Sequence, residues 1–163
     1  MKSMFKISLI SLQIALFVGC SPEEELHKIP SDFAGWVLIA FDQTEGEEPR
    51  YEDKKRIYQI PPNGILKTKA HFNKGVISPD KRSFFSIEAS ENLIPLRFGD
   101  FNSKDGQNKT KIIGNMGVVG TSERKKNTGG GLYYFVGTKA DYIRKKGEFQ
   151  SFIENATKIC LED

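Results

Sequence analysis

Two histidines are the side chains of this sequence best suited to acid–base chemistry or metal binding near neutral pH. His27 lies in a polar stretch near the N-terminus, and His71 follows a turn rich in proline and glycine. Neither belongs to a His-x-x-x-His pair, and a zinc site needs three or four ligands at compatible spacing. Cys160 is 89 residues beyond His71. The sequence therefore predicts no metal site and no cofactor.

The sequence also contains no complete catalytic motif of the kinds considered below. Residues 120–123, Gly-Thr-Ser-Glu, lack the second glycine of a Gly-x-Ser-x-Gly nucleophile elbow. No stretch matches the glycine pattern of a phosphate-binding loop. The sequence favours a domain that is not an enzyme. The alternative hypothesis is a hydrolase or transferase of the cell envelope that uses His71 with a nearby carboxylate, either Asp80 or Glu88.

Two charged loops are better explained by solvation than by binding. Five acidic residues lie in residues 45–53, but the segment lacks the alternation of aspartates that a twelve-residue calcium loop requires. Three cations, Arg124, Lys125 and Lys126, stand beside a run of glycines. They could touch an anionic surface, although a solubilising loop is the simpler interpretation.

The first twenty residues are typical of an export signal. Lys2 and Lys6 form a short basic region, and an apolar run follows from Ile7 to Val18. The run is too short to span a bilayer, which takes about 20 apolar residues. Charged and proline residues follow at once after Cys20. We therefore expect a secretory signal rather than a membrane-spanning helix.

The end of this signal, Phe17-Val18-Gly19-Cys20, resembles the lipobox of bacterial lipoproteins. The resemblance implies that residues 1–19 are removed and that Cys20 carries palmitate and other acyl chains. Two or three chains anchor a protein far more firmly than one. The expected location is then a membrane, with the domain facing the periplasm or the cell exterior. Ser21 after the cysteine favours the outer membrane in a Gram-negative host.

Removal of this signal leaves 144 of the 163 residues, the size of one domain. Lys2 and Lys6 leave with it, so 22 of the 24 basic residues face 21 acidic ones. Such a near-neutral, exported chain is not expected to bind nucleic acid. With Cys20 lipidated, Cys160 is an odd cysteine. Its place on the apolar side of a helical pattern predicts a buried thiol.

Apolar patterning predicts the elements of this domain. We expect a lipidated tether over residues 20–32 and one globular domain over residues 33–163. Residues 36–41 and 132–136 are apolar on both alternating faces, which favours buried strands. Residues 56–68 are predicted to form a hairpin around Pro61-Pro62-Asn63-Gly64. Further strands are expected at residues 82–88 and, as an edge strand containing a proline, at residues 93–98.

The last part of the sequence predicts an amphipathic helix. Thr138 and Asp141 have the spacing of a helix N-cap, and apolar residues then recur at steps of three, four and seven up to Cys160. Gly147 is a place where this helix could divide. The predicted fold class is therefore mainly β with some α: an antiparallel β-sandwich-like domain with a C-terminal amphipathic helix.

A set of short motifs resembles a family of small bacterial secreted or lipid-anchored domains of unknown function. The motifs are Gly35-Trp36-Val37, Ile60-Pro61 with Gly64-Ile65-Leu66, and Phe135-Val136-Gly137-Thr138, accompanied by Ile29-Pro30, Phe33, Thr68 and Phe84-Phe85. The resemblance implies a single domain and carries no catalytic residues. The function predicted from the sequence is a lipid-anchored envelope protein with a binding or structural role, held to the membrane at Cys20 and with an envelope protein as a possible partner.

Overall fold

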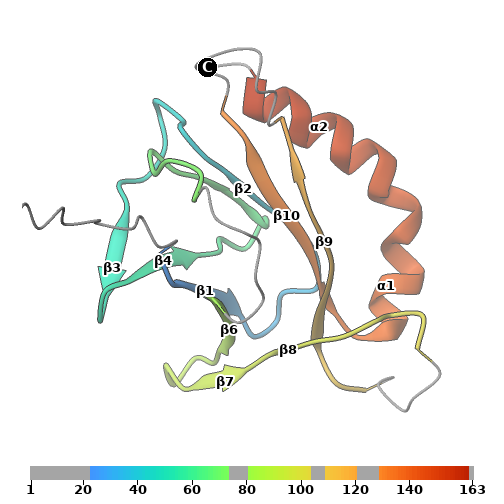
Figure 1. The fold of residues 1–163 in the computed structure, drawn as a ribbon. Helices are drawn as coiled ribbons and strands as arrows, with labels where there is room; N and C mark the ends of the chain where they lie inside the picture. Colours follow the sequence, from blue (N-terminus) through green and yellow to red (C-terminus); the bar gives the residue numbers. More distant parts are fainter. Residues whose placement is uncertain (1–22, 74–80, 104–108, 121–128, 162–163) are drawn as a thin grey trace, which may run out of the picture.

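The computed structural model describes residues 23–73, 81–103, 109–120 and 129–161. They form two five-stranded β-sheets that face each other, and a C-terminal helical segment covers the outer face of the second sheet (Figure 1). The predicted fold class, mainly β and sandwich-like with a C-terminal amphipathic helix, is confirmed. The pairing within each sheet is mixed rather than antiparallel throughout.

The first sheet is organised around its N-terminal strand. Its order is β3 (Arg50–Glu52), β4 (Lys55–Gln59), β1 (Glu25–Pro30), β6 (Arg82–Ile87) and β7 (Leu93–Pro95). Strand β1 pairs in parallel with both β4 and β6, whereas the two outer pairs are antiparallel. The three strands β1, β4 and β6 therefore run in the same direction. Their N-terminal ends lie together at one end of the sheet, and their C-terminal ends lie together at the other end.

The second sheet is centred on a strand from late in the chain. Its order is β5 (Ile65–Lys67), β2 (Gly35–Ala40), β10 (Gly131–Gly137), β9 (Ile112–Val119) and β8 (Arg97–Phe98). Strand β10 pairs antiparallel with β2 and β9, and the outer pairs are parallel. The aromatic and β-branched composition of β10 suits this central position.

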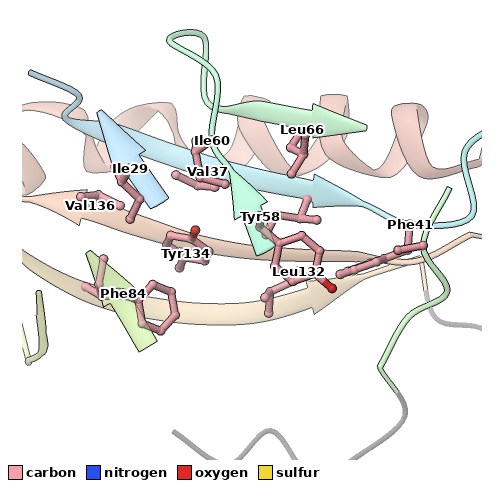
Figure 2. Close-up of a cluster of buried hydrophobic side chains, with 13 residues drawn as sticks. Ile29, Val37, Phe41, Tyr58, Ile60, Leu66, Phe84, Leu132, Tyr134 and Val136 are labelled. Atoms are coloured by element: carbon pink, nitrogen blue, oxygen red, sulfur yellow. The ribbon is translucent and has the colours of Figure 1, made fainter. Parts of the chain in front are cut away.

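Strand β2 is buried at every position because its two faces serve different cores. Val37 and Ile39 belong to the core between the sheets, which also contains Leu132, Tyr134 and Val136 of β10 (Figure 2). Trp36 and Leu38 point the other way and pack against the helical segment. The expectation that this strand is buried on both sides is confirmed.

The helical segment begins with a capping box. The hydroxyl of Thr138 accepts a hydrogen bond from the Asp141 backbone N–H, and the Asp141 carboxylate accepts one from the Thr138 backbone N–H at 3.0 Å. Helix α1 (Lys139–Lys145) is followed by the 3₁₀ turn η2 (Lys146–Glu148) and helix α2 (Phe149–Leu161). The predicted N-cap, the division near Gly147 and the burial of Cys160 are all confirmed.

The expected tether over residues 20–32 is wrong for residues 25–30, which form β1 in the middle of the first sheet. The inward-facing residues of β1 are Glu25, His27 and Ile29, so two of its three buried side chains are polar. A strand that turns carboxylate and imidazole groups inward does not show the usual apolar alternation. The folded unit therefore begins before residue 33, where the sequence analysis placed its start.

The predicted hairpin over residues 56–68 is also wrong. Strand β4 has neighbours on both sides, β1 and β3, so β5 has no free edge of β4 to pair with. Pro61 and Pro62 have no N–H to extend the ladder. The chain then turns at Gly64, whose φ is 77°, and crosses to β2 in the second sheet. By contrast, residues 93–98 supply an edge strand to each sheet, as their proline predicts.

Candidate functional site

A cluster of charged and polar side chains is buried between the two sheets, near the N-terminal ends of β1, β4 and β6. We call it the buried polar cluster; its members are Glu25, His27, Arg56, Tyr58, Arg82 and Tyr134. The alternation of each strand turns these residues inward together. Glu25 stands opposite both Arg56 and Arg82 in the strand register. Parallel pairing thus brings one carboxylate between two guanidinium groups.

Glu25 is the centre of this cluster. Arg82 Nε donates to Glu25 Oε2, and Asn73 Nδ2 donates to Oε1 at 3.1 Å. Burial by itself raises the pKa of this carboxyl, but the neighbouring His27, Arg82 and Asn73 outweigh it and lower the pKa to about 2. Glu25 is therefore anionic over the whole physiological range, and its charge is matched inside the protein.

His27 is sealed from solvent, with an exposed fraction of 0%. Its ring stacks on Phe84 with centroids 4.4 Å apart, and Nδ1 lies 3.0 Å from the hydroxyl of Tyr134. Burial lowers its pKa below the usual value, with the carboxylate of Glu25 acting in the opposite direction. The ring is neutral at pH 7. This cluster links β1, β4 and β6 of the first sheet to Tyr134 of the second.

A cavity of the described structure lies at the opposite end of β1. It has a volume of about 730 Å³ and is open to solvent. We call it the Trp36 pocket. Its walls come from three separate parts of the chain: the turn and strand over residues 32–36, the corner at Pro62 and Asn63, and the helical segment over residues 145–155.

Local contacts hold these three walls together. Lys145 Nζ, at the end of α1, donates to the carbonyl of Ala34 at 2.8 Å. Lys111 Nζ donates to the carbonyl of Phe33, also at 2.8 Å. The corner approaches β2 so closely that a Cβ on Gly64 would stand 2.6 Å from the carbonyl oxygen of Trp36. Only glycine permits this contact at the positive φ of that residue.

The lining combines aromatic and polar groups. Phe33, Trp36 and Phe152 supply the aromatic part, and the polar part consists of Asp32, Asn63, Lys145, Glu148, Ser151 and Asn155. Trp36 is 9% exposed, and its Nε1 is buried without a hydrogen-bond partner among the described residues. A second hollow of about 470 Å³ adjoins this end of the sandwich and shares Asp32 with the pocket.

His71 does not join either cavity. Its side chain is 92% exposed and Nδ1 contacts Oδ1 of Asp42. The backbone carbonyl of His71 accepts a hydrogen bond from Arg56. His71 therefore lies near the N-terminal ends of β1 and β4. Glu88 follows the other end of β6 and lines the second hollow. The expected pairing of His71 with Glu88 is therefore wrong, and Asp80 lies outside the described residues.

The remaining candidate residues fall into three groups. Cys20 and the basic residues 124–126 lie outside the described residues. Cys160 is buried, and burial raises the pKa of its thiol to about 11, so it is not a reactive nucleophile. The acidic loop is exposed, and Glu47 and Glu48 pair there with Arg50 and Lys69. The sequence did not indicate Glu25 or the pocket, and His27, expected in a polar N-terminal stretch, is instead buried in β1.

The described residues contain neither a candidate metal-binding cluster nor a helix that could cross a membrane. No group of three or more His, Cys, Asp or Glu side chains in that part of the chain could hold a metal ion. None of its helices has the length and apolar character needed to cross a membrane.

Comparison with known proteins places the sequence in context. A family model described as a family of unknown function, DUF6843, matches residues 21–128. Among solved structures, the chain is similar to a "Putative Lipoprotein from Bacillus anthracis", with a TM-score of 0.48 and 11% sequence identity over 70% of this chain and 69% of that chain. No curated protein matches the sequence significantly. The family match spans β1 to β9 and ends before β10 and the helical segment.

Proposed function

The chain belongs to DUF6843, a family of unknown function, and from this premise we propose that it is a lipid-anchored envelope protein with a ligand-binding β-sandwich. The anchor is Cys20, acylated after removal of residues 1–19. The role is binding rather than catalysis. The observation that carries the proposal is the position of the Trp36 pocket relative to the anchored end of the chain.

Only four residues separate Cys20 from the start of β1 at Glu25. A fully extended chain spans at most about 3.6 Å per residue, so these five steps reach about 18 Å. The end of the domain at which β1 begins is then held close to the bilayer. Strand β1 carries the chain away from that edge for six residues, or about 20 Å at 3.3 Å each.

The Trp36 pocket and the second hollow both lie just after β1 ends, at Asp32. They therefore open at the end of the domain that points away from the membrane. An anchored receptor needs this arrangement, because a ligand in the envelope meets the far end of the domain first. The short link between Cys20 and β1 restricts the tilting that a long tether would allow.

The positions of the two histidines support a non-catalytic role. His27 is enclosed between the sheets, and His71 projects into solvent beside Asp42, away from both cavities. A general base must lie within hydrogen-bond reach of a bound substrate. Neither imidazole lies in the lining of the Trp36 pocket.

Labelling with radioactive palmitate tests the anchor. Cells that express the wild-type chain should incorporate label into a membrane-bound protein, whereas Cys20→Ala should abolish both labelling and membrane fractionation. The matched control is Cys160→Ala, which changes the other cysteine of the chain and should leave labelling intact. Equal labelling of wild type and Cys20→Ala would refute the proposal.

A further inference from the structure

We propose that the Trp36 pocket binds a neutral sugar unit of an envelope glycan. The inference names the ligand class for the site in the proposed function, and it rests on that proposal for the place where the ligand is met. Three features of the lining carry it: the inventory of hydrogen-bonding groups, the balance of charge, and the aromatic surface beside them.

The exposed polar side chains suit a ligand with many hydroxyl groups. Asp32 and Glu148 offer carboxylate oxygens, each of which accepts hydrogen bonds. Asn63 uses its Oδ1 to accept the backbone N–H of Ile65 at 3.0 Å, so its amide N–H groups are the part of this side chain that can donate to a ligand. Asn155 adds an amide that both donates and accepts. A sugar hydroxyl does both as well, so it can satisfy every one of these groups.

The charge balance argues against an anionic ligand. The lining has two carboxylates, Asp32 and Glu148, and one ammonium group, Lys145. That ammonium already donates to the carbonyl of Ala34 at 2.8 Å, as part of the contact that holds the helical segment to β2. A phosphate or carboxylate ligand would meet two like charges against a single cation, so the net negative charge of the lining disfavours it. A neutral polar ligand meets no such repulsion.

The aromatic part of the lining argues against a purely polar or ionic ligand. Phe33 and Phe152 are half-buried and leave part of their surface at the pocket. The C–H face of a pyranose ring is apolar and packs on such surfaces while its hydroxyl groups project sideways to the polar rim. Pockets that bind small ligands combine an apolar floor with a few placed polar groups in this way, at volumes of about 300–1,000 Å³.

Trp36 packs beneath this aromatic surface. Its ring lies against Phe149 and Phe152, with centroids 4.6 and 5.5 Å away, and Trp36 is 9% exposed. A ligand that contacts Phe152 therefore alters the surroundings of the indole.

Trp36 also makes the site measurable, because it is the only tryptophan of the chain. The experiment titrates the full chain, in a detergent without a sugar headgroup, with a tetramer of N-acetylglucosamine and follows the fluorescence of Trp36. We expect a saturable change in intensity or wavelength. The double variant Glu148→Gln with Asn155→Ala should weaken binding about tenfold or more, which corresponds to about 1.4 kcal/mol.

Gln150→Ala is the matched control, because Gln150 is exposed on the same helix, pairs with Glu154 and is not part of the lining. It should bind as the wild type does. A Trp36 signal that does not change with the tetramer, or that changes equally in the double variant, would overturn the inference. So would a response to tri-lysine without one to the tetramer, since that would identify the carboxylates as a site for cations.

The two proposals fail separately. Sugar binding by a chain that takes up no palmitate would reject the anchor and retain the pocket. Conversely, the chain could take up palmitate while its Trp36 fluorescence does not change with the tetramer. That result would reject the sugar site and retain the anchor.

Discussion

The two faces of strands β2 and β10 meet very different surroundings. Toward the first sheet, Tyr134 reaches His27 in the buried polar cluster, where Glu25 pairs with Arg82. Toward the helical segment, Trp36 and Phe135 belong to an aromatic layer in which their centroids lie 5.1 Å apart. One sheet therefore separates a core with matched charges from a core of aromatic rings.

The difference shows two ways to hold an element in place. Hydrogen bonds and ion pairs are directional, so the buried polar cluster defines the register of β1 against β4 and β6. Aromatic packing is less directional and tolerates an imperfect boundary. This is the side on which the pocket opens. The Trp36 pocket thus lies beside the aromatic layer, and β1 belongs to the core with matched charges.

The largest effect should come from removing one charge of the buried polar cluster. Arg82→Met retains much of the side-chain volume but leaves Glu25 buried without its cation. We expect the free energy of unfolding to fall by about 3–5 kcal/mol. Urea denaturation followed by circular dichroism measures it.

Leu38→Met is the comparison on the helical side, where Leu38 is fully buried in the cluster that includes Cys160. A swap that conserves volume in an apolar core should cost less than about 1.5 kcal/mol. Equal losses in the two variants would break the distinction between the cores.

The second prediction concerns pH and the buried imidazole. Because the pKa of His27 is lowered from its usual 6.5, the unfolded chain binds more protons than the folded one as the pH falls below 6.5. Stability therefore declines with acid in that range, by at most about 1.4 kcal/mol per pH unit. Glu25, with a pKa of about 2 instead of 4.5, adds a further loss below pH 4.5.

His27→Gln should flatten the stability profile between pH 6.5 and 4.5, and it should also reduce the loss attributed to Glu25, because His27 helps to lower the pKa of that carboxyl. Thermal unfolding over a pH series measures this. His71→Gln changes the only other histidine of the sequence, which is exposed, and is the comparison for this variant. If His71→Gln flattened the profile instead, the assignment to the core would be wrong.

The smallest effect should come from the edge of the aromatic layer. Thr138→Ala removes the capping box at the start of α1 and should cost about 1 kcal/mol. Thr157→Ala, inside α2, exchanges a weak helix former for a strong one and should not destabilise. Denaturation midpoints compare the two. A loss in Thr157→Ala as large as that in Thr138→Ala would mean that capping is not what holds this layer.

The sequence predicts well those elements whose pattern is local. The apolar run of β2, the aromatic run of β10 and the capping residues at Thr138 and Asp141 each indicate their element without help from distant contacts. The proline of residues 93–98 likewise indicates an edge. In each case the burial or hydrogen bonding is decided by residues within one stretch of the chain.

The elements that were not predictable depend on distant partners. Strand β1 is a strand because Glu25 and His27 find Arg82 and Tyr134, more than 50 residues away. Residues 61–64 contain the signals of a hairpin turn, yet they join the two sheets. The reason is that β3 and β1 already pair with the two sides of β4. The pocket is lined by residues from 32–36, 62–63 and 145–155. No local sequence pattern predicts that three such distant segments lie side by side.

The place of β1 in its sheet also determines how the protein would carry a load. Strand β1 hydrogen-bonds to a parallel neighbour on each side, along four paired positions with β4 and six with β6. A pull on the domain, resisted by lipid at Cys20, would act along this strand. Its ladders would then be sheared together rather than opened one hydrogen bond at a time. Attachment through β1 would therefore load two parallel ladders at once.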